Sequence, residues 1–132
     1  MKQAILITLL FIFCIACNKD DDQNNDLQLV SGKWYFETRD GEEAGGCHKR
    51  CNVEFTSDGR LIFEAFVGAE PNCINTENYT GTYTVSGNDL TIVLGSETIN
   101  GTFCISNGVL TYIGEALFTH EAYTSTYDKT PE

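Results

Sequence analysis

The stretch TYTVSGNDLTIVLGSETINGTFCISNGVLTYI, residues 82–113, contains the pattern that decides the fold. Short runs rich in Thr, Tyr, Val and Ile are separated by Gly87-Asn88, Gly95-Ser96 and Asn107-Gly108, which can adopt the positive backbone angles of tight hairpin turns. Within each run the apolar side chains recur two residues apart, as they do on one face of a strand. The stretch therefore predicts consecutive antiparallel strands.

The same pattern extends from Trp34 almost to the end of the chain and predicts eight strands. No part of this pattern has a helical period. A single helical turn is expected just before it, at Leu27–Val30. Consecutive strands with one apolar face close most economically as an antiparallel up-and-down barrel, because closure removes the exposed edges. A two-sheet sandwich is the competing arrangement. The expected strands are Lys33–Thr38, Asn52–Thr56, Arg60–Val67, Tyr79–Val85, Leu90–Leu94, Glu97–Ile105, Val109–Ile113 and Leu117–Tyr127.

Alternation also assigns an inner face to these strands. In the last one, Tyr123 and Tyr127 share a phase that would also turn Glu121 inward, so its inner face is less clear. The expected inner residues are Trp34, Phe36, Val53, Phe55, Leu61, Phe63, Tyr83, Val85, Leu90, Ile92, Leu94, Phe103, Ile105, Leu110 and Tyr112.

A barrel of eight strands is either just filled by side chains or holds one small ligand. The large inward rings favour a filled interior, and an apolar ligand would then bind at the open mouth. The aromatic residues expected to contact such a ligand are Phe36, Phe55, Phe63, Tyr83, Phe103 and Tyr112.

The N-terminus has the layout of a secretory signal peptide. Met1-Lys2 is followed by an apolar stretch over residues 4–13 and by Ile15-Ala16, which is small at the cleavage position. The stretch is too short to cross a bilayer comfortably. We expect residues 1–16 to be a signal peptide that is removed.

The junction Cys14-Ile15-Ala16-Cys17 resembles the lipobox of bacterial lipoproteins, with Cys14 where Leu is usual. The resemblance implies that the Cys17 sulfur receives a diacylglycerol and that the new amine is acylated, with palmitate as the expected chain. Several acyl chains would anchor the protein firmly. Ordinary signal cleavage or an uncleaved anchor is the alternative.

The run Lys19-Asp20-Asp21-Asp22 resembles the export signal of Bacteroidetes-type surface lipoproteins, in which Lys and acidic residues follow the lipidated cysteine. It implies a protein held on the outer membrane and facing the cell exterior. Residues 17–26 contain almost only Asp, Asn, Gln and Lys after the cysteine, so they are also expected to form a solvated tether. The folded domain is expected over residues 27–132.

The net charge limits the partners. Without residues 1–16 the chain has seven basic and nineteen acidic side chains, a formal charge of −12. Such a surface argues against nucleic acid and against adhesion to anionic lipid, so the membrane would be contacted through the N-terminal lipid alone. We expect a monomer.

Four cysteines remain in the folded part: Cys47, Cys51, Cys73 and Cys104. Four cysteines in an exported domain imply two disulfides, which can be paired in three ways.

Several motifs together resemble the small lipocalin-like lipoproteins of the Bacteroidetes type. The first is Gly32-Lys33-Trp34 after Leu29-Val30-Ser31, which is similar to the opening of lipocalin-like domains. The others follow in order along the chain, and the likeness covers about residues 27–127. They are Cys47 placed eight residues before Phe55, the run Thr56-Ser57-Asp58-Gly59, Cys73, Thr80-Gly81-Thr82-Tyr83, Asn88-Asp89-Leu90-Thr91-Ile92 and Val109-Leu110-Thr111-Tyr112.

The resemblance implies roles for particular residues. The indole of Trp34 would plug the closed end of the barrel. The family usually has one cysteine pair, which matches Cys47 and Cys73, so the added cysteines would form a second bridge, Cys51–Cys104.

Other chemistry has weaker support in the sequence. Cys47, His48 and Cys51 could bind zinc, but a structural site needs four ligands and His120 is the only other histidine. Thiol redox catalysis would need a close pair such as Cys-x-x-Cys, which the folded part does not contain.

Charged residues give no stronger signal. Glu54 and Glu64 fall on the polar phase of their strands, so a catalytic role is not expected. The pair Lys49-Arg50 could meet an anionic ligand, although a solvated loop is the simpler interpretation. We expect no catalytic residues, metal or cofactor.

The expected function is therefore non-enzymatic. A lipid-anchored barrel on the cell surface would bind a small hydrophobic molecule or a surface component. The alternative is an accessory protein with a filled barrel that contacts a neighbouring protein, for example through Ile62 and Phe66.

Overall fold

The computed structural model describes residues 30–116 and 119–130. The predicted signal peptide, Cys17, the export signal and the tether lie outside these ranges, as do the first three residues of the predicted helical turn. Its last residue, Val30, is helical. Among the described residues, no helix has the length and apolar character needed to span a bilayer.

The described part of the chain is almost entirely strand. In chain order its elements are β1 (Gly32–Arg39), β2 (Glu42–Glu43), the 3-10 helix η1 (Gly46–Arg50), β3 (Asn52–Phe55), β4 (Arg60–Ala69), β5 (Asn72–Ser86), β6 (Asp89–Leu94), β7 (Glu97–Ser106), β8 (Val109–Glu115) and β9 (Ala122–Asp128).

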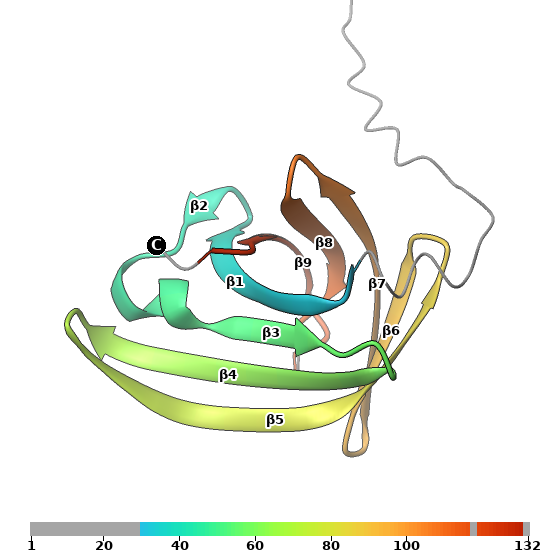
Figure 1. Ribbon diagram of the computed structural model, residues 1–132, viewed down its shortest axis with the longest axis horizontal. Coiled ribbons are helices and arrows are strands. Elements are labelled where there is room, and N and C mark those ends of the chain that lie inside the picture. Colours follow the sequence, from blue (N-terminus) through green and yellow to red (C-terminus); the bar gives the residue numbers. More distant parts are fainter. Residues whose placement is uncertain (1–29, 117–118, 131–132) are drawn as a thin grey trace, which may run out of the picture.

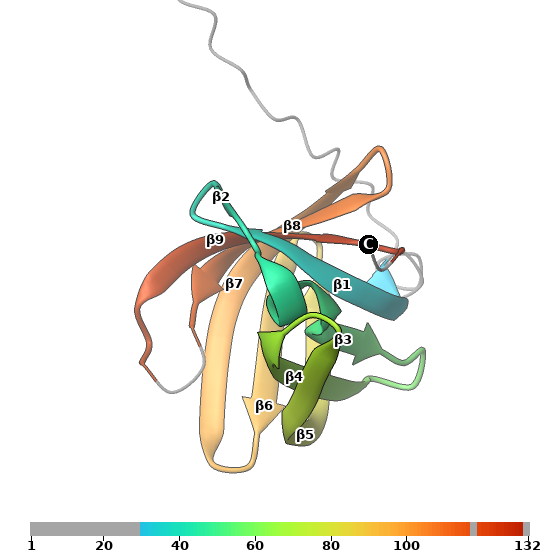
Figure 2. The same cartoon turned by 90° about the vertical axis from the view of Figure 1, so that its left-hand side faces the viewer.

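Eight strands form a closed antiparallel barrel (Figures 1 and 2). From β3 to β9 each strand pairs with the next one along the chain, β1 pairs with β3, and a further β1–β9 pairing closes the ring. The short strand β2 only extends the end of β1. The predicted up-and-down barrel is confirmed, and the sandwich is excluded.

The closing pair contains an irregularity. Phe36 lies opposite Tyr127, but the next paired residue of β1 is Thr38, opposite Thr126, so the register shifts between Phe36 and Thr38. The hydroxyl oxygens of Thr38 and Thr126 lie 2.7 Å apart and form a hydrogen bond across the seam. A bulge of this kind increases the local twist, which helps the first and last strands to meet.

The predicted inner face is confirmed almost completely. Every expected inner residue except Phe36 is buried in the core or packs against it. Phe36 is half-buried, and its ring centroid lies 5.7 Å from that of Tyr127, beside the bulge. The core also contains Val30 and Ile99, and Tyr123 and Tyr127 pack against it.

The last strand begins later than predicted, at Ala122 and not at Leu117. A tight turn precedes it: His120 has a positive φ of 54°, and the Ala116 amide donates to the Glu121 carbonyl at 2.8 Å. Glu121 therefore lies outside the strand and is exposed, which removes the conflict in its phase.

Strand β5, which corresponds to the strand predicted over Tyr79–Val85, begins earlier than predicted, at Asn72 and not at Tyr79. Pairing with β4 continues to Ala69 opposite Asn72, past a bulge at Thr76. Cys73, expected in a loop, is therefore part of a strand. The long β4–β5 hairpin projects past the other strands, as Figure 1 shows. We call its outer part, residues 65–78, the arm.

One disulfide joins the arm to η1. Cys47 and Cys73 are bonded with an S–S distance of 2.04 Å and a Cα–Cα distance of 5.4 Å, which confirms the predicted pair. The bridge spans a sequence separation of 26 residues. Closing a loop of that length lowers the entropy of the unfolded chain, which stabilises the folded state by about 3.5 kcal/mol.

The second predicted bridge, Cys51–Cys104, is wrong. Cys51 is a free thiol immediately before β3, whose neighbours in the barrel are β1 and β4. Cys104 lies on β7, between β6 and β8, and alternates with the core residues Phe103 and Ile105. Bonded cysteines need Cα atoms within about 7 Å, which these two positions in the barrel do not provide.

Two glycines allow a close crossing between β7 and β8. Gly101 and Gly114 lie directly opposite each other, and the Tyr112 phenol lies over them. A Cβ atom at Gly114 would be 2.5 Å from the Gly101 Cα and 2.5 Å from the Tyr112 oxygen. Neither contact can be relieved by a small side-chain shift, since one atom is backbone and the other belongs to a buried ring.

We therefore expect Gly114→Ala to lower the free energy of unfolding by about 1–3 kcal/mol, as overpacking does in well-packed interiors. Urea unfolding followed by near-UV circular dichroism measures the change. Gly45→Ala is the matched control, because Gly45 has an extended backbone and a Cβ atom added there would meet no other atom within 4 Å. Equal stability of the two variants would contradict the packing argument.

Candidate binding site at the open end of the barrel

One end of the barrel is closed by Trp34. Only 1% of its surface is exposed, and its ring nitrogen donates a 2.7 Å hydrogen bond to the Val30 carbonyl. The Lys129 ammonium lies 3.8 Å from the ring centroid and also donates to the Ser31 carbonyl at 2.8 Å. This cation–π contact covers the indole from outside.

The barrel interior is nearly filled. A cavity of about 60 Å³ remains inside it. Pockets that enclose drug-sized molecules measure roughly 300–1,000 Å³, so a whole ligand of that size does not fit. The cavity is lined by Val53, Phe55, Leu61, Phe63, Leu90, Ile92, Leu94, Ile99, Phe103, Leu110, Tyr112, Tyr123 and Tyr127.

Tyrosine side chains supply the polar groups of this interior. Tyr112 donates to the Glu115 carbonyl at 3.1 Å, and the fully buried Ser125 hydroxyl lies 3.2 Å from the Tyr127 oxygen. Burial raises the pKa of Tyr127 far above its ordinary value, and the neighbouring Tyr123 adds to the shift. Burial is also the main cause that raises the pKa of Tyr112.

At the opposite end, the arm continues the inner face of the barrel outward. Phe63 lines the cavity and lies opposite Tyr79, with the two rings stacked at 6.2 Å. Because side chains alternate along β4, Val67 points to the same face as Phe63, and Ile74 lies opposite Val67. Val67 and Ile74 are 42% and 63% exposed. An apolar surface therefore runs from the cavity onto the arm.

The arm has no strand beside it among the described residues. The β3–β4 pairing ends at Glu64, and β6 pairs with β5 only over Thr82–Ser86. On its β3 side the backbone of Phe66 instead contacts Cys51: the amide donates to the sulfur at 3.2 Å, and the thiol donates to the carbonyl at 3.5 Å. The disulfide and this thiol fix the arm where the ladder ends.

The family model of the lipocalin-like domain matches residues 30–130, which is most of the chain and all of its barrel strands. The chain belongs to the lipocalin-like domain family. No curated protein matches it in sequence.

In this lipocalin-like barrel, four of the six aromatic residues expected at a ligand line the cavity: Phe55, Phe63, Phe103 and Tyr112. Tyr83 lies beside it, packed edge-on against Phe55 at 4.9 Å, with its hydroxyl donating to the Thr56 carbonyl at 2.6 Å.

The sequence interpretation missed one member of the lining, Ile99. Tyr123 and Tyr127 also belong to it; their shared phase was noted in the sequence, but Glu121 shares that phase and left the inner face of the strand open. Val67 and Ile74 were missed at the mouth because polar residues surround Ile74 in the sequence.

The residues considered for metal or acid–base chemistry are engaged in other contacts. Among the described residues, potential metal ligands gather at Cys47, Glu70 and Cys73, but the disulfide leaves neither sulfur as a thiolate. His120 lies away from η1, with its ring nitrogen 3.1 Å from the Glu97 carboxylate.

Two of the charged residues considered earlier, Arg50 and Glu64, are also paired. Arg50 donates two hydrogen bonds to Glu70, at 2.9 and 2.8 Å. The pKa of Glu64 is lowered mainly by a hydrogen bond from the Asn52 side-chain amide. The Lys33 ammonium, 3.3 Å from the carboxylate, lowers it further.

The buried tyrosines predict an alkaline limit to stability. Above a pH of about 10, unfolded tyrosines ionise, whereas Tyr112 and Tyr127 remain neutral in the native state because their pKa values are raised. The native state then binds more protons, so the free energy of unfolding falls by up to about 1.4 kcal/mol per pH unit for each such residue.

Urea unfolding between about pH 8 and 11, with phenolate absorbance as a second signal, measures this slope. We expect Tyr127→Phe to reduce it. A slope that is unchanged in this variant would contradict the assignment of Tyr127.

Proposed function

We propose that this protein is a lipid-anchored lipocalin-like lipoprotein of the outer membrane, facing the cell exterior, that binds an apolar group at the open end of its barrel. The group would belong to a small hydrophobic molecule or to a component of the same surface. The single observation that supports this proposal is the apolar surface that passes from the cavity through Phe63 and Tyr79 to Val67 and Ile74.

The size of the cavity decides how a ligand would be held. A volume of about 60 Å³ has room for the end of an aliphatic chain and not for a whole ligand. The remainder would lie on the arm, where the exposed side chains of Val67 and Ile74 lose contact with water on binding. The binding free energy would then come mainly from the mouth.

The anchor proposal relies on the N-terminal sequence. The lipobox-like Cys17 and the following Lys19-Asp20-Asp21-Asp22 support attachment by lipid and export to the surface. The ten-residue tether over residues 17–26 would reach at most about 35 Å. The acidic surface of the chain would not adhere to anionic membrane lipids, so the acyl chains on Cys17 would be its contact with the membrane.

A second candidate function uses the same exposed pair. Val67 and Ile74 could dock against a neighbouring surface protein while the filled barrel takes up no small molecule. In both cases we propose binding and not catalysis. Glu70, which lies in the arm, is engaged in an ion pair with Arg50 at 2.8 Å.

We expect Cys17→Ala to release the protein from membranes, because it removes the proposed site of acylation. Fractionation of cells followed by detection of the protein in soluble and membrane fractions measures the effect. Cys51→Ala, which changes a cysteine inside the folded domain, should leave the protein with the membranes. A Cys17→Ala protein that still sediments with membranes would disprove lipid anchoring through this residue.

The mouth can be tested with 1-decanol as an uncharged aliphatic probe. In ¹H–¹⁵N spectra of the chain from residue 18 onward, we expect decanol to shift signals of Phe63, Val67, Ile74 and Tyr79. Val67→Asp and Ile74→Asp should each weaken binding by about tenfold, since each replaces an apolar contact with a charge.

Ile113→Asp is the matched control, because Ile113 is 52% exposed on β8, away from the arm. Shifts that are equally weakened by Ile113→Asp would contradict a site at the mouth. If decanol causes no shifts, small-molecule binding is disproved. Chemical cross-linking on cells would then test the second candidate function. A neighbouring protein that is cross-linked to the unchanged chain and to Ile113→Asp, but not to Val67→Asp, would identify the arm as a protein-docking surface.

A further inference from the structure

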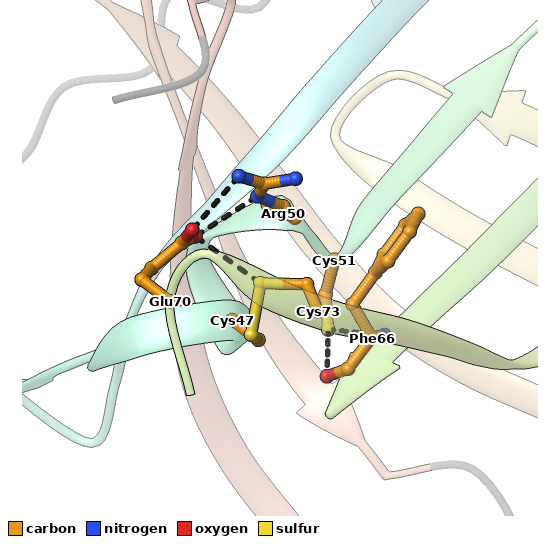
Figure 3. Close-up of a disulfide and its surroundings, with 6 residues drawn as sticks. All are labelled: Cys47, Arg50, Cys51, Phe66, Glu70 and Cys73. Atoms are coloured by element: carbon orange, nitrogen blue, oxygen red, sulfur yellow. Dashed lines mark hydrogen bonds and ion pairs between the residues drawn. A yellow bond between two sulfur atoms is a disulfide. The ribbon is translucent and has the colours of Figure 1, made fainter. Parts of the chain in front are cut away.

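Three cysteines lie together where η1 meets the arm (Figure 3). Cys47, within η1, is bonded to Cys73 on β5, and the free thiol of Cys51 directly follows η1. Beyond the part that it takes in holding the arm, neither the barrel architecture nor the proposed binding at the mouth explains why a free thiol lies beside a disulfide.

The thiol and the disulfide contact neighbouring positions of β4. The Cys51 sulfur lies 3.2 Å from the Phe66 amide nitrogen. Two residues further along, Gly68 lies opposite Cys73, and a Cβ atom at Gly68 would be 3.8 Å from the Cys47 sulfur. Two residues of a strand span about 6.7 Å, so a modest movement of the end of η1 would bring Cys51 to Cys47.

The surroundings favour attack from inside the protein. Cys47 has no exposed surface, so a thiol from solution cannot reach its sulfur in the native state. Attack on Cys73 is disfavoured in a different way, because the Glu70 carboxylate oxygen lies 3.2 Å from that sulfur and repels an approaching thiolate. Cys51 is a nucleophile already placed on the buried side.

We propose that Cys51 exchanges with the Cys47–Cys73 disulfide and acts as an internal release for the arm. The Cys51 thiolate, after losing its proton to solvent, attacks the Cys47 sulfur. A Cys47–Cys51 bond forms as the Cys47–Cys73 bond breaks, and the electron pair leaves on the Cys73 sulfur, which takes up a proton. The step is an isomerisation, so no oxidant or reductant is consumed.

The exchange changes how the arm is held. The covalent tie between η1 and β5 is replaced by a short loop within residues 47–51, and the arm carries a half-buried thiol at Cys73. Glu70 opposes the step, because its carboxylate disfavours a thiolate forming beside it. The Arg50 guanidinium, bonded twice to Glu70, offsets part of this charge.

Sulfur connectivity in the purified full chain tests the proposal. The protein is held without reductant at about pH 8.5, where a cysteine thiol is partly ionised. Samples are alkylated rapidly with iodoacetamide at intervals, digested and mapped without reduction. We expect a Cys47–Cys51 peptide and alkylated Cys73 to accumulate together, with a first-order rate that does not depend on protein concentration.

Two variants make the outcome specific. Cys51→Ser should reduce alkylation of Cys73 by at least about tenfold, while its hydroxyl can still bond to the Phe66 backbone and preserve the fold. Glu70→Gln should speed the exchange roughly threefold for each unit by which it lowers the pKa of the leaving thiol.

Three results would overturn the proposal. Alkylation of Cys51 alone throughout the time course would show that it does not attack the disulfide. Recovery of a Cys51–Cys73 bond with alkylated Cys47 would show attack at the other sulfur. Alkylation of Cys73 that persists at full rate in Cys51→Ser would show that another thiol opens the disulfide. Decanol binding takes no part in this readout, so the outcome is independent of the proposed function.

Discussion

The pairing between β1 and β9 is the constraint on which the rest of the structure depends. Without it the sheet would have two open edges and the apolar side chains would line an exposed curved surface. The seam is short and irregular, since it includes a register shift between Phe36 and Thr38. The Thr38–Thr126 hydrogen bond and the Phe36–Tyr127 ring contact lie on either side of that shift along β1 and stabilise it.

Closure also explains the composition of the interior. A ring of eight short strands leaves little space, and the aromatic rings nearly fill it, so that only about 60 Å³ remains. Tyrosines can take part in this filling because their hydroxyls reach backbone carbonyls or Ser125 and are not left without a partner. The glycine pair at positions 101 and 114 gives the Tyr112 ring room to lie flat across two strands.

The barrel could be predicted from the sequence because alternation and turn chemistry agree along most of the chain. Leu90, Ile92 and Leu94, for instance, are apolar at every second position and follow a Gly87-Asn88 turn, and all three are buried.

The arm could not be predicted in this way. Its β5 half is polar on both faces apart from Ile74, because it lies outside the core, and only pairing with β4 makes it a strand. Cys51 was assigned to the wrong partner for a related reason. Its position in the sequence does not reveal that its sulfur forms a hydrogen bond with the backbone of Phe66 on β4.

The position of the disulfide follows from where the sheet loses its neighbours. Inside the barrel each strand is held by two ladders, and a crosslink there would add little order. The arm keeps one ladder, so its other side needs a substitute, and η1 with Cys47, Cys73 and the Cys51 thiol provides one. An arm fixed in this way presents Val67 and Ile74 without further ordering on binding, which is the condition under which a small apolar surface gives useful affinity. A crosslink that can migrate to Cys51 would place that preorganisation under chemical control, with the barrel itself left unchanged.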